Sequence, residues 1–208
     1  MCGIVGLFLK DPKLEPRLGA MLTDMLITMT DRGPDSAGIA IYGRHHDGMA
    51  KLTVQSPDPM NDFKGLVEDL GAAIAASVTG VIKDTHIVLD LPLNRLDAAR
   101  EAITTLRPNA TVMSAGEGIE IYKEVGLPKD VAARFDVARM SGTHGIGHTR
   151  MATESAVTTQ GAHPFSTGSD QCLVHNGSLS NHNSVRRVLK RAGMTFQTEN
   201  DTEVAAAF

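Results

Sequence analysis

A cysteine, Cys2, directly follows the N-terminal methionine, and the other of the two cysteines, Cys172, lies far along the chain. Aminopeptidases remove a methionine when the next residue is small, which would leave the Cys2 thiol beside a free α-amino group. Such an amine has a pKa near ~8, so its neutral fraction at neutral pH can accept the thiol proton. Cys2 is therefore a candidate nucleophile that carries its own general base.

Three other segments carry groups that suit the attack of a thiol on an amide. In VHNG, Asn176 and Gly177 can present a side-chain amide and a backbone N–H to a developing oxyanion. In GHTRMAT, Arg150 can hold a carboxylate through two parallel hydrogen bonds, and Thr153 can add a hydroxyl. In ENDTE, Asp201 can bind an ammonium group.

Each of these residues also has an ordinary structural interpretation. Asn-Gly is a common turn, a lone arginine commonly forms a surface ion pair, and Asp201 suits the N-cap of a helix. A cysteine at position 2, taken alone, is more often incidental than catalytic. Together, however, a thiol, oxyanion donors, one cation and one anion fit an α-amino acid with a side-chain carbonyl. Glutamine, with ammonia as the leaving group, is the obvious candidate.

Composition limits the class of protein. Hydrophobic residues make up 42% and charged residues 21% of the 208 residues, which predicts one large folded domain, with or without an inserted lobe. The formal net charge is −4 with no basic tract, so we expect no nucleic-acid partner. The sequence shows no signal peptide and no apolar run of membrane-spanning length, so we expect a cytoplasmic protein without membrane contact. The scattered histidines predict no metal site.

Hydrophobic periodicity predicts the elements that must position these residues. Residues 2–8 indicate a buried strand, and residues 15–30 an amphipathic helix packed on a sheet. Two short strands, 39–42 and 49–55, are joined by a polar turn, which predicts a hairpin. Residues 171–181 indicate an apolar strand that runs into a loop.

Residues 57–140 have a different character. They read as an alanine-rich helix (66–78), a strand (86–91), a helix (95–106) and a strand–turn–strand unit (110–123). This order predicts a small α+β lobe inserted into the main fold. The chain then stops at NDTEVAAAF, early in a predicted helix, so we expect the natural protein to continue beyond residue 208.

Six motifs follow one another in the order typical of a known family: MCGIVG, RGPDSAG, GHTRMAT, AHPF, VHNG followed by SNH, and NDTEV. Over residues 1–208 the chain resembles class II glutamine amidotransferases, which belong to the N-terminal-nucleophile hydrolase superfamily. The resemblance implies an α+β fold, a four-layer αββα sandwich with Cys2 at the start of a central strand and the 57–140 lobe inserted within it.

The resemblance also implies a role for each candidate site residue. These roles are the nucleophile (Cys2), the oxyanion hole (Asn176 and Gly177), the clamp on glutamine (Arg150 and Asp201), and lesser substrate contacts (Thr153 and the backbone near His163). The implied reaction is hydrolysis of the glutamine side-chain amide through a cysteine thioester, giving glutamate and ammonia.

The long segment between RGPDS and GHTR, together with GTHGIGHTRMATES, most resembles the stand-alone amidotransferase subunit of glutamate synthase-like systems, including N-methylglutamate synthase. This implies no cofactor in this chain. It also implies a synthase partner that receives the ammonia and carries FMN and an iron–sulfur cluster.

Two other hypotheses stay open. One is a catalytically degenerate regulatory or scaffold subunit, against which the intact Cys2, Asn176, Arg150 and Asp201 argue. The other is a related N-terminal-nucleophile amide hydrolase with another substrate, which the Arg150/Asp201 pair disfavours without excluding it.

Overall fold

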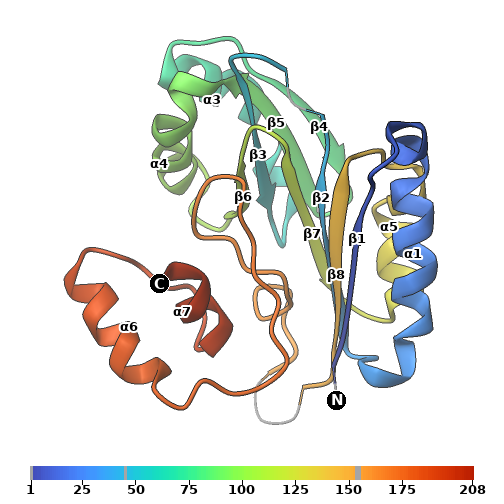
Figure 1. Ribbon diagram of the computed structural model, residues 1–208. Coiled ribbons are helices and arrows are strands. Elements are labelled where there is room, and N and C mark those ends of the chain that lie inside the picture. The colour runs from blue at the N-terminus through green and yellow to red at the C-terminus, as the bar shows by residue number, and fades with distance from the viewer. Residues whose placement is uncertain (1, 45, 153–155) are drawn as a thin grey trace.

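The structure, a computed structural model, describes residues 2–44, 46–152 and 156–208. The chain forms two four-stranded antiparallel sheets with helices on their outer faces (Figure 1). The first sheet has the order β1 (Gly3–Phe8), β8 (His144–Arg150), β2 (Ser36–Tyr42), β7 (Ile119–Val125). The second has the order β4 (Thr79–Lys83), β5 (His86–Pro92), β3 (Met49–Gln55), β6 (Thr111–Gly116).

One helical layer, α1 (Leu18–Thr28) with α5 (Pro128–Arg134), covers the outer face of the first sheet. Leucines four residues apart on α1 are fully buried against the sheet, as the amphipathic pattern predicts. Glycine in β8 allows this close approach, because a Cβ on Gly147 would lie 2.8 Å from Cδ1 of Leu26. The predicted N-terminal helix is confirmed for α1, and the residues before it form the 3₁₀ helix η1 (Pro12–Arg17).

A second helical layer, α3 (Leu66–Ile74) with α4 (Leu96–Leu106), covers the outer face of the second sheet, and the short α2 (Pro59–Asp62) precedes α3. Between the sheets lies a small apolar core made of Ala40, Met113, Ile119 and Ile121. The order helix, sheet, sheet, helix confirms the predicted α+β four-layer sandwich.

Residues 57–140 contribute to both sheets. They supply β4, β5 and β6, which join β3, and the α3/α4 layer above them. They also supply β7 and α5, which belong to the first sheet and its helical layer.

Three sequence-based expectations are wrong. Strand β1, which follows Cys2, lies at the edge of the first sheet and is not a central strand. The strands β2 and β3 do not form a hairpin, because β2 pairs with β8 and β7 while β3 pairs with β5 and β6. Both are central strands buried on both faces, and the link between them passes from one sheet to the other. Residues 171–181 do not form a strand, since Leu173 makes only an isolated bridge to Phe165.

The C-terminal part of the chain lies beside the end of the first sheet where β1 begins (Figure 1). It holds α6 (His182–Arg191) and α7 (Asp201–Ala207), which pack on each other. Within the described ranges, no helix combines the length and the apolar character needed to cross a membrane.

Candidate active site

A cavity of about 970 Å³ lies where β1 begins and β8 ends. Because these strands are antiparallel, with Gly3 opposite Thr149, the residues just outside that pair are brought together from opposite ends of the sequence. Cys2 immediately precedes β1, Arg150 is the last residue of β8, and both line the cavity. The loops that lead into α6 and α7 complete its lining.

The cavity brings together six of the seven candidate site residues, namely Cys2, Arg150, His163, Asn176, Gly177 and Asp201. The seventh, Thr153, lies outside the described residues. The structure therefore places in one space a thiol, an amide followed by glycine, a guanidinium and a carboxylate.

Hydrogen bonds fix Cys2 and the first residue of β1, which follows it. The Cys2 Sγ lies 3.4 Å from the backbone N–H of Met151, which donates to it. The next residue, Gly3, donates its N–H to Thr149 Oγ1 at 3.2 Å. A Cβ on Gly3 would lie 2.8 Å from that same oxygen, so this approach of the strand to Thr149 requires glycine.

The RGPDSAG motif supports the end of β8 rather than lining the cavity. The backbone N–H of Asp35 donates to Arg150 O at 3.1 Å, and the Asp35 carboxylate accepts from the N–H of Ala152 at 2.7 Å. Two hydrogen bonds from one residue thus hold the segment that presents Arg150 to the cavity.

Asn176 is held at both ends of its amide. Its Nδ2 donates to the backbone oxygen of Cys2 at 3.0 Å, and its Oδ1 lies 2.8 Å from Nε2 of His148. The following Gly177 passes close to a ring, because a Cβ there would lie 2.8 Å from Nε2 of His175. The Asn176 amide is therefore bonded to the residue that carries the thiol, and Gly177 is the next residue along the chain.

The two charged residues of the proposed clamp come from different elements. Arg150 is 7% exposed and donates through Nη1 to Ala156 O at 3.4 Å. Asp201 is the first residue of α7, and its carboxylate accepts from the N–H of Leu179 at 2.7 Å. The N-cap interpretation of Asp201 is wrong, because Asn200 caps the helix by accepting from Thr202 N at 2.8 Å.

Two buried histidines lie next to Asn176: His148 is hydrogen-bonded to its amide, and His163 stacks on His148. The rings of His148 and His163 stack with centroids 4.2 Å apart, and a 2.9 Å hydrogen bond joins His163 Nε2 to Thr202 Oγ1. Burial lowers the pKa of His148 to about 4, and burial together with the adjacent His148 lowers the pKa of His163. Both rings are therefore neutral at pH 7.

Sequence reasoning missed His148, although a signal for it existed. Side chains alternate between the faces of a strand, so His148 lies on the same face of β8 as Arg150, two residues later. Once Arg150 is assigned to the cavity, the same face predicts that His148 lies beside it.

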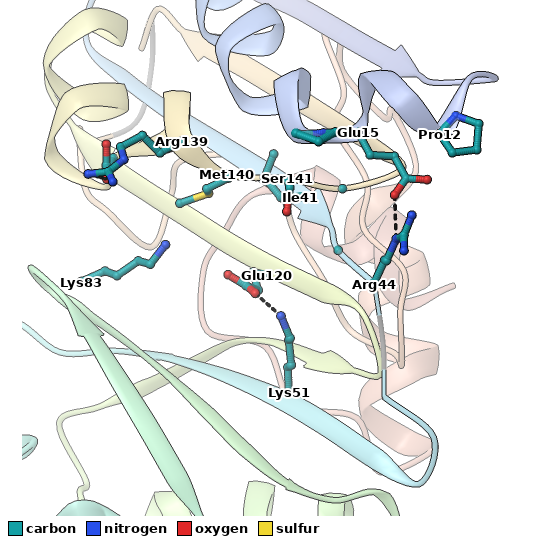
Figure 2. Close-up of a pocket in the computed structure, with 14 residues that line it drawn as sticks. Pro12, Glu15, Ile41, Arg44, Lys51, Lys83, Glu120, Arg139, Met140 and Ser141 are labelled. Carbon is teal, nitrogen blue, oxygen red and sulfur yellow. Dashed lines mark hydrogen bonds and ion pairs between the residues drawn. The ribbon is translucent and has the colours of Figure 1, made fainter.

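A second cavity, of about 830 Å³, lies at the opposite end of the first sheet, near the end of β2 (Figure 2). Its walls carry ion pairs between Arg44 and Glu15, at 2.8 Å, and between Lys51 and Glu120. Lys83 reaches into the same space from β4 (Figure 2) and lies over the Tyr122 ring, 5.2 Å from its centroid. Among the described residues that line it, none is a cysteine or a histidine.

The profile of a family described as "Glutamine amidotransferase domain" matches residues 136–208. The glutamine amidotransferase-like protein GlxB of Rhizobium meliloti (strain 1021) is 65% identical over 209 residues, covering 100% of this chain and 69% of the relative. A candidate glutamine amidotransferase of Methanothermobacter thermautotrophicus is 35% identical over 218 residues, covering 98% of this chain and 70% of the relative.

A glutamine–fructose-6-phosphate aminotransferase of Methanosarcina acetivorans is 42% identical over 100 residues, which cover 46% of this chain and 16% of that protein. The similarity to GlxB extends over the whole chain, and the domain profile includes the segments that carry Arg150, Asn176 and Asp201. On these grounds the chain belongs to the glutamine amidotransferase family.

Proposed function

We propose that this chain is a class II glutamine amidotransferase, which hydrolyses the side-chain amide of glutamine to glutamate and ammonia. The observation that carries the proposal is the cavity that Cys2 shares with Asn176, Gly177, Arg150 and Asp201. A thiol next to amide donors suits acyl transfer, and a cation and an anion on the same walls suit an α-amino acid.

The first half of the reaction forms a thioester. After removal of Met1, the α-amine of Cys2 takes the thiol proton, and the thiolate attacks the carbonyl carbon of the glutamine side chain. The oxyanion of the tetrahedral intermediate accepts hydrogen bonds from Asn176 Nδ2 and from the N–H of Gly177. The C–N bond then breaks, and the protonated amine delivers its proton to the leaving nitrogen, which departs as ammonia.

The second half returns the free enzyme. The α-amine takes a proton from a water molecule, whose oxygen attacks the thioester carbonyl and forms a second oxyanion at the same donors. Collapse of this intermediate breaks the C–S bond, releases glutamate, and returns the proton to the thiolate. The same residue thus supplies the nucleophile and the base in the first half, and the base and the leaving group in the second.

Two charged residues hold the amino-acid end of glutamine in this proposal. Arg150 binds the α-carboxylate through its guanidinium, and Asp201 binds the α-ammonium group. Thr153 and the backbone near His163 make lesser contacts. The His163 ring does not serve this purpose, because it is 5% exposed and is bonded to Thr202.

Ammonia released here is passed to a synthase partner in the cytoplasm, and that partner carries FMN and an iron–sulfur cluster. The proposed synthase partner is supported by the resemblance of the GTHGIGHTRMATES segment to amidotransferase subunits of N-methylglutamate synthase-like systems. In the fructose-6-phosphate aminotransferase relative, the region similar to this chain makes up 16% of the protein. Most of that relative therefore lies outside the region that it shares with this chain.

The test is release of glutamate and ammonia from glutamine by the purified chain, alone and with the products of neighbouring genes. We expect weak activity alone and strong stimulation by a synthase partner, together with loss of Met1 in the mass spectrum of active protein. A thioester adduct of Cys2, trapped by acid quench, would support the covalent route. Absence of glutamine hydrolysis under both conditions would favour a regulatory subunit, and hydrolysis of other amides alone would favour a different amide hydrolase.

A further inference from the structure

We infer that His148 is a positioning residue that aims the Asn176 amide at the oxyanion. The inference rests on the proposed function, because it concerns the oxyanion hole of that reaction. A hydrogen bond of 2.8 Å joins His148 Nε2 to Asn176 Oδ1.

Donor and acceptor rules fix the orientation of this amide. The backbone oxygen of Cys2 can only accept, so the amide atom 3.0 Å from it must be the Nδ2 of Asn176. The other end of the amide is then Oδ1, which also only accepts. The Nε2 of His148 must therefore carry the hydrogen, and a flipped amide would place two acceptors against each other.

The ring of His148 is itself held in place. Its strand β8 lies between β1 and β2, with His148 opposite Ile4 on one side and Gly38 on the other. The side chain is fully buried, and its ring stacks on His163, which is bonded to Thr202 of α7. A chain of contacts thus runs from α7 through two histidines to Asn176.

These contacts restrict rotation of the Asn176 amide, the motion that would turn an oxyanion donor away from its acceptor. The terminal torsion of an asparagine side chain has a broad energy profile, so its amide rotates easily unless both ends are bonded. With one N–H donated to Cys2 O and Oδ1 held by His148, the second N–H of Nδ2 keeps a fixed direction. Preorganised donors of this kind stabilise the transition state without a cost of reorientation.

Charge plays no part in this role. Burial lowers the pKa of His148 to about 4, so at neutral pH the ring is neutral and carries a single proton. The hydrogen bond assigns that proton to Nε2. His148 therefore acts as a neutral donor to Asn176 and not as a general acid or base.

Two substitutions separate the hydrogen bond from packing. His148→Phe keeps a ring stacked on His163 but removes the donor, whereas His148→Gln retains an amide N–H close to the place of Nε2. We expect His148→Phe to lower kcat for glutamine hydrolysis by roughly 10- to 100-fold with KM little changed, which is less than the loss on removing a donor outright. His148→Gln should recover most of this loss.

A double-variant cycle tests whether His148 acts through Asn176. In an Asn176→Ala background, His148→Phe should change kcat by less than about twofold, because the group that it positions is gone. Alkylation of Cys2 by iodoacetamide needs no oxyanion donor, so its rate should be the same in all folded variants. Equal losses in the Phe and Gln variants, or a full loss in the Asn176→Ala background, would overturn the inference.

The tautomer gives a readout that is independent of turnover. Nitrogen-15 NMR of histidine-labelled protein, with His148 assigned by comparison with His148→Gln, should show the Nε2–H tautomer at neutral pH. The Nδ1–H tautomer would overturn the inference even if glutaminase activity is normal. If instead the unsubstituted chain shows the Nε2–H tautomer but never hydrolyses glutamine, the proposed function fails while the geometry of the pair stands.

Discussion

The Cys2 cavity and the cavity of Figure 2 lie at opposite ends of the first sheet and differ in how their polar groups are used. The cavity of Figure 2 has charged walls, but Glu15 holds Arg44 and Glu120 holds Lys51, so these charges neutralise each other. In the Cys2 cavity, Asp201 accepts from a backbone N–H, and Asn176 is bonded to a backbone oxygen and a neutral histidine. Volume and charge alone therefore do not distinguish an active site.

The difference follows from what each end of the sheet assembles. At the Cys2 end, the start of β1, the end of β8 and the start of α7 converge, and each contributes one reactive or charged group. At the other end, the ion pairs link η1 to the segment after β2, and β3 to β7. The first arrangement suits a ligand with a carboxylate, an ammonium and an amide, whereas the second ties elements of the fold together.

The largest effect is expected for Cys2→Ala, which removes the nucleophilic thiol while leaving the α-amine and the fold intact. Glutamine hydrolysis should fall by at least about 10⁴-fold, because removal of a catalytic nucleophile commonly costs that much or more. The measurement is glutamate release by purified protein. Cys172→Ala is the matched control and should retain activity, since Cys172 packs beside the core between the sheets. Substantial turnover by the Cys2 variant would remove this thiol from the mechanism.

Asn176→Ala should give the next largest loss. If its amide is an oxyanion donor, kcat should fall by roughly 10²–10³ while KM changes little. Steady-state kinetics over a range of glutamine concentrations separates the two constants. A rise in KM with unchanged kcat would show that Asn176 binds the ground state of glutamine instead.

Arg150→Lys should act on binding. Lysine keeps the charge but loses the planar fork, so we expect KM for glutamine to rise about 10-fold with a smaller change in kcat. Arg44→Lys makes the same chemical change in the cavity of Figure 2 and should leave both constants unchanged. Comparable increases in KM for both variants would contradict the assignment of glutamine to the Cys2 cavity.

Much of the fold follows from local patterns in the sequence. The spacing of Leu18, Leu22 and Leu26 predicts a helix on a sheet, and α1 has that structure. The pairing of β2 and β3 could not be predicted, because central strands buried on both faces have no alternating pattern to show which sheet they join. Strand pairing is set by contacts distant in sequence.

The candidate site likewise has residues that local motifs predict and a contact that only the tertiary structure reveals. Motif chemistry pointed to Cys2, Arg150 and Asn176, which the structure brings around one cavity. The contact of His148 with Asn176 depends on the pairing of β8 with β1 and on the path of residues 171–181. Residues 171–181 were wrongly predicted to form a strand, because their apolar side chains are typical of one. The local sequence contains no sign that a partner strand is absent.

The buried pair His148 and His163 also predicts that the free energy of unfolding decreases at acidic pH. In the unfolded chain His148 and His163 have an ordinary pKa of about 6.5, and in the folded chain the pKa of each is lowered. Below pH ~6.5 the unfolded chain binds more protons, so the free energy of unfolding falls as the pH falls, by up to about 1.4 kcal/mol per unit for each histidine. For His148 this continues to about pH 4, its folded pKa.

Urea unfolding at a series of pH values from about 7 to about 5 measures this slope. Burial also lowers the pKa of His86 and of His144, so these rings add to the slope in both proteins. The His148→Phe variant lacks one of the titrating rings, and its free energy of unfolding should fall less steeply than that of the unsubstituted chain. An identical slope in both proteins would show that His148 does not titrate on unfolding in this range.

The smallest effect is expected for Arg44→Gln, which removes a charge from the cavity of Figure 2. Arg44 is 75% exposed in its side chain, and its ion pair with Glu15 is screened by water, so its loss should cost less than about 1 kcal/mol. Glutamine hydrolysis should change by less than about twofold, because this cavity lies at the other end of the sheet from Cys2. Urea unfolding and steady-state kinetics on the same preparation test both statements. A large loss of activity with normal stability would mean that the two cavities are coupled, and the contrast between a binding end and a structural end of the sheet would then be wrong.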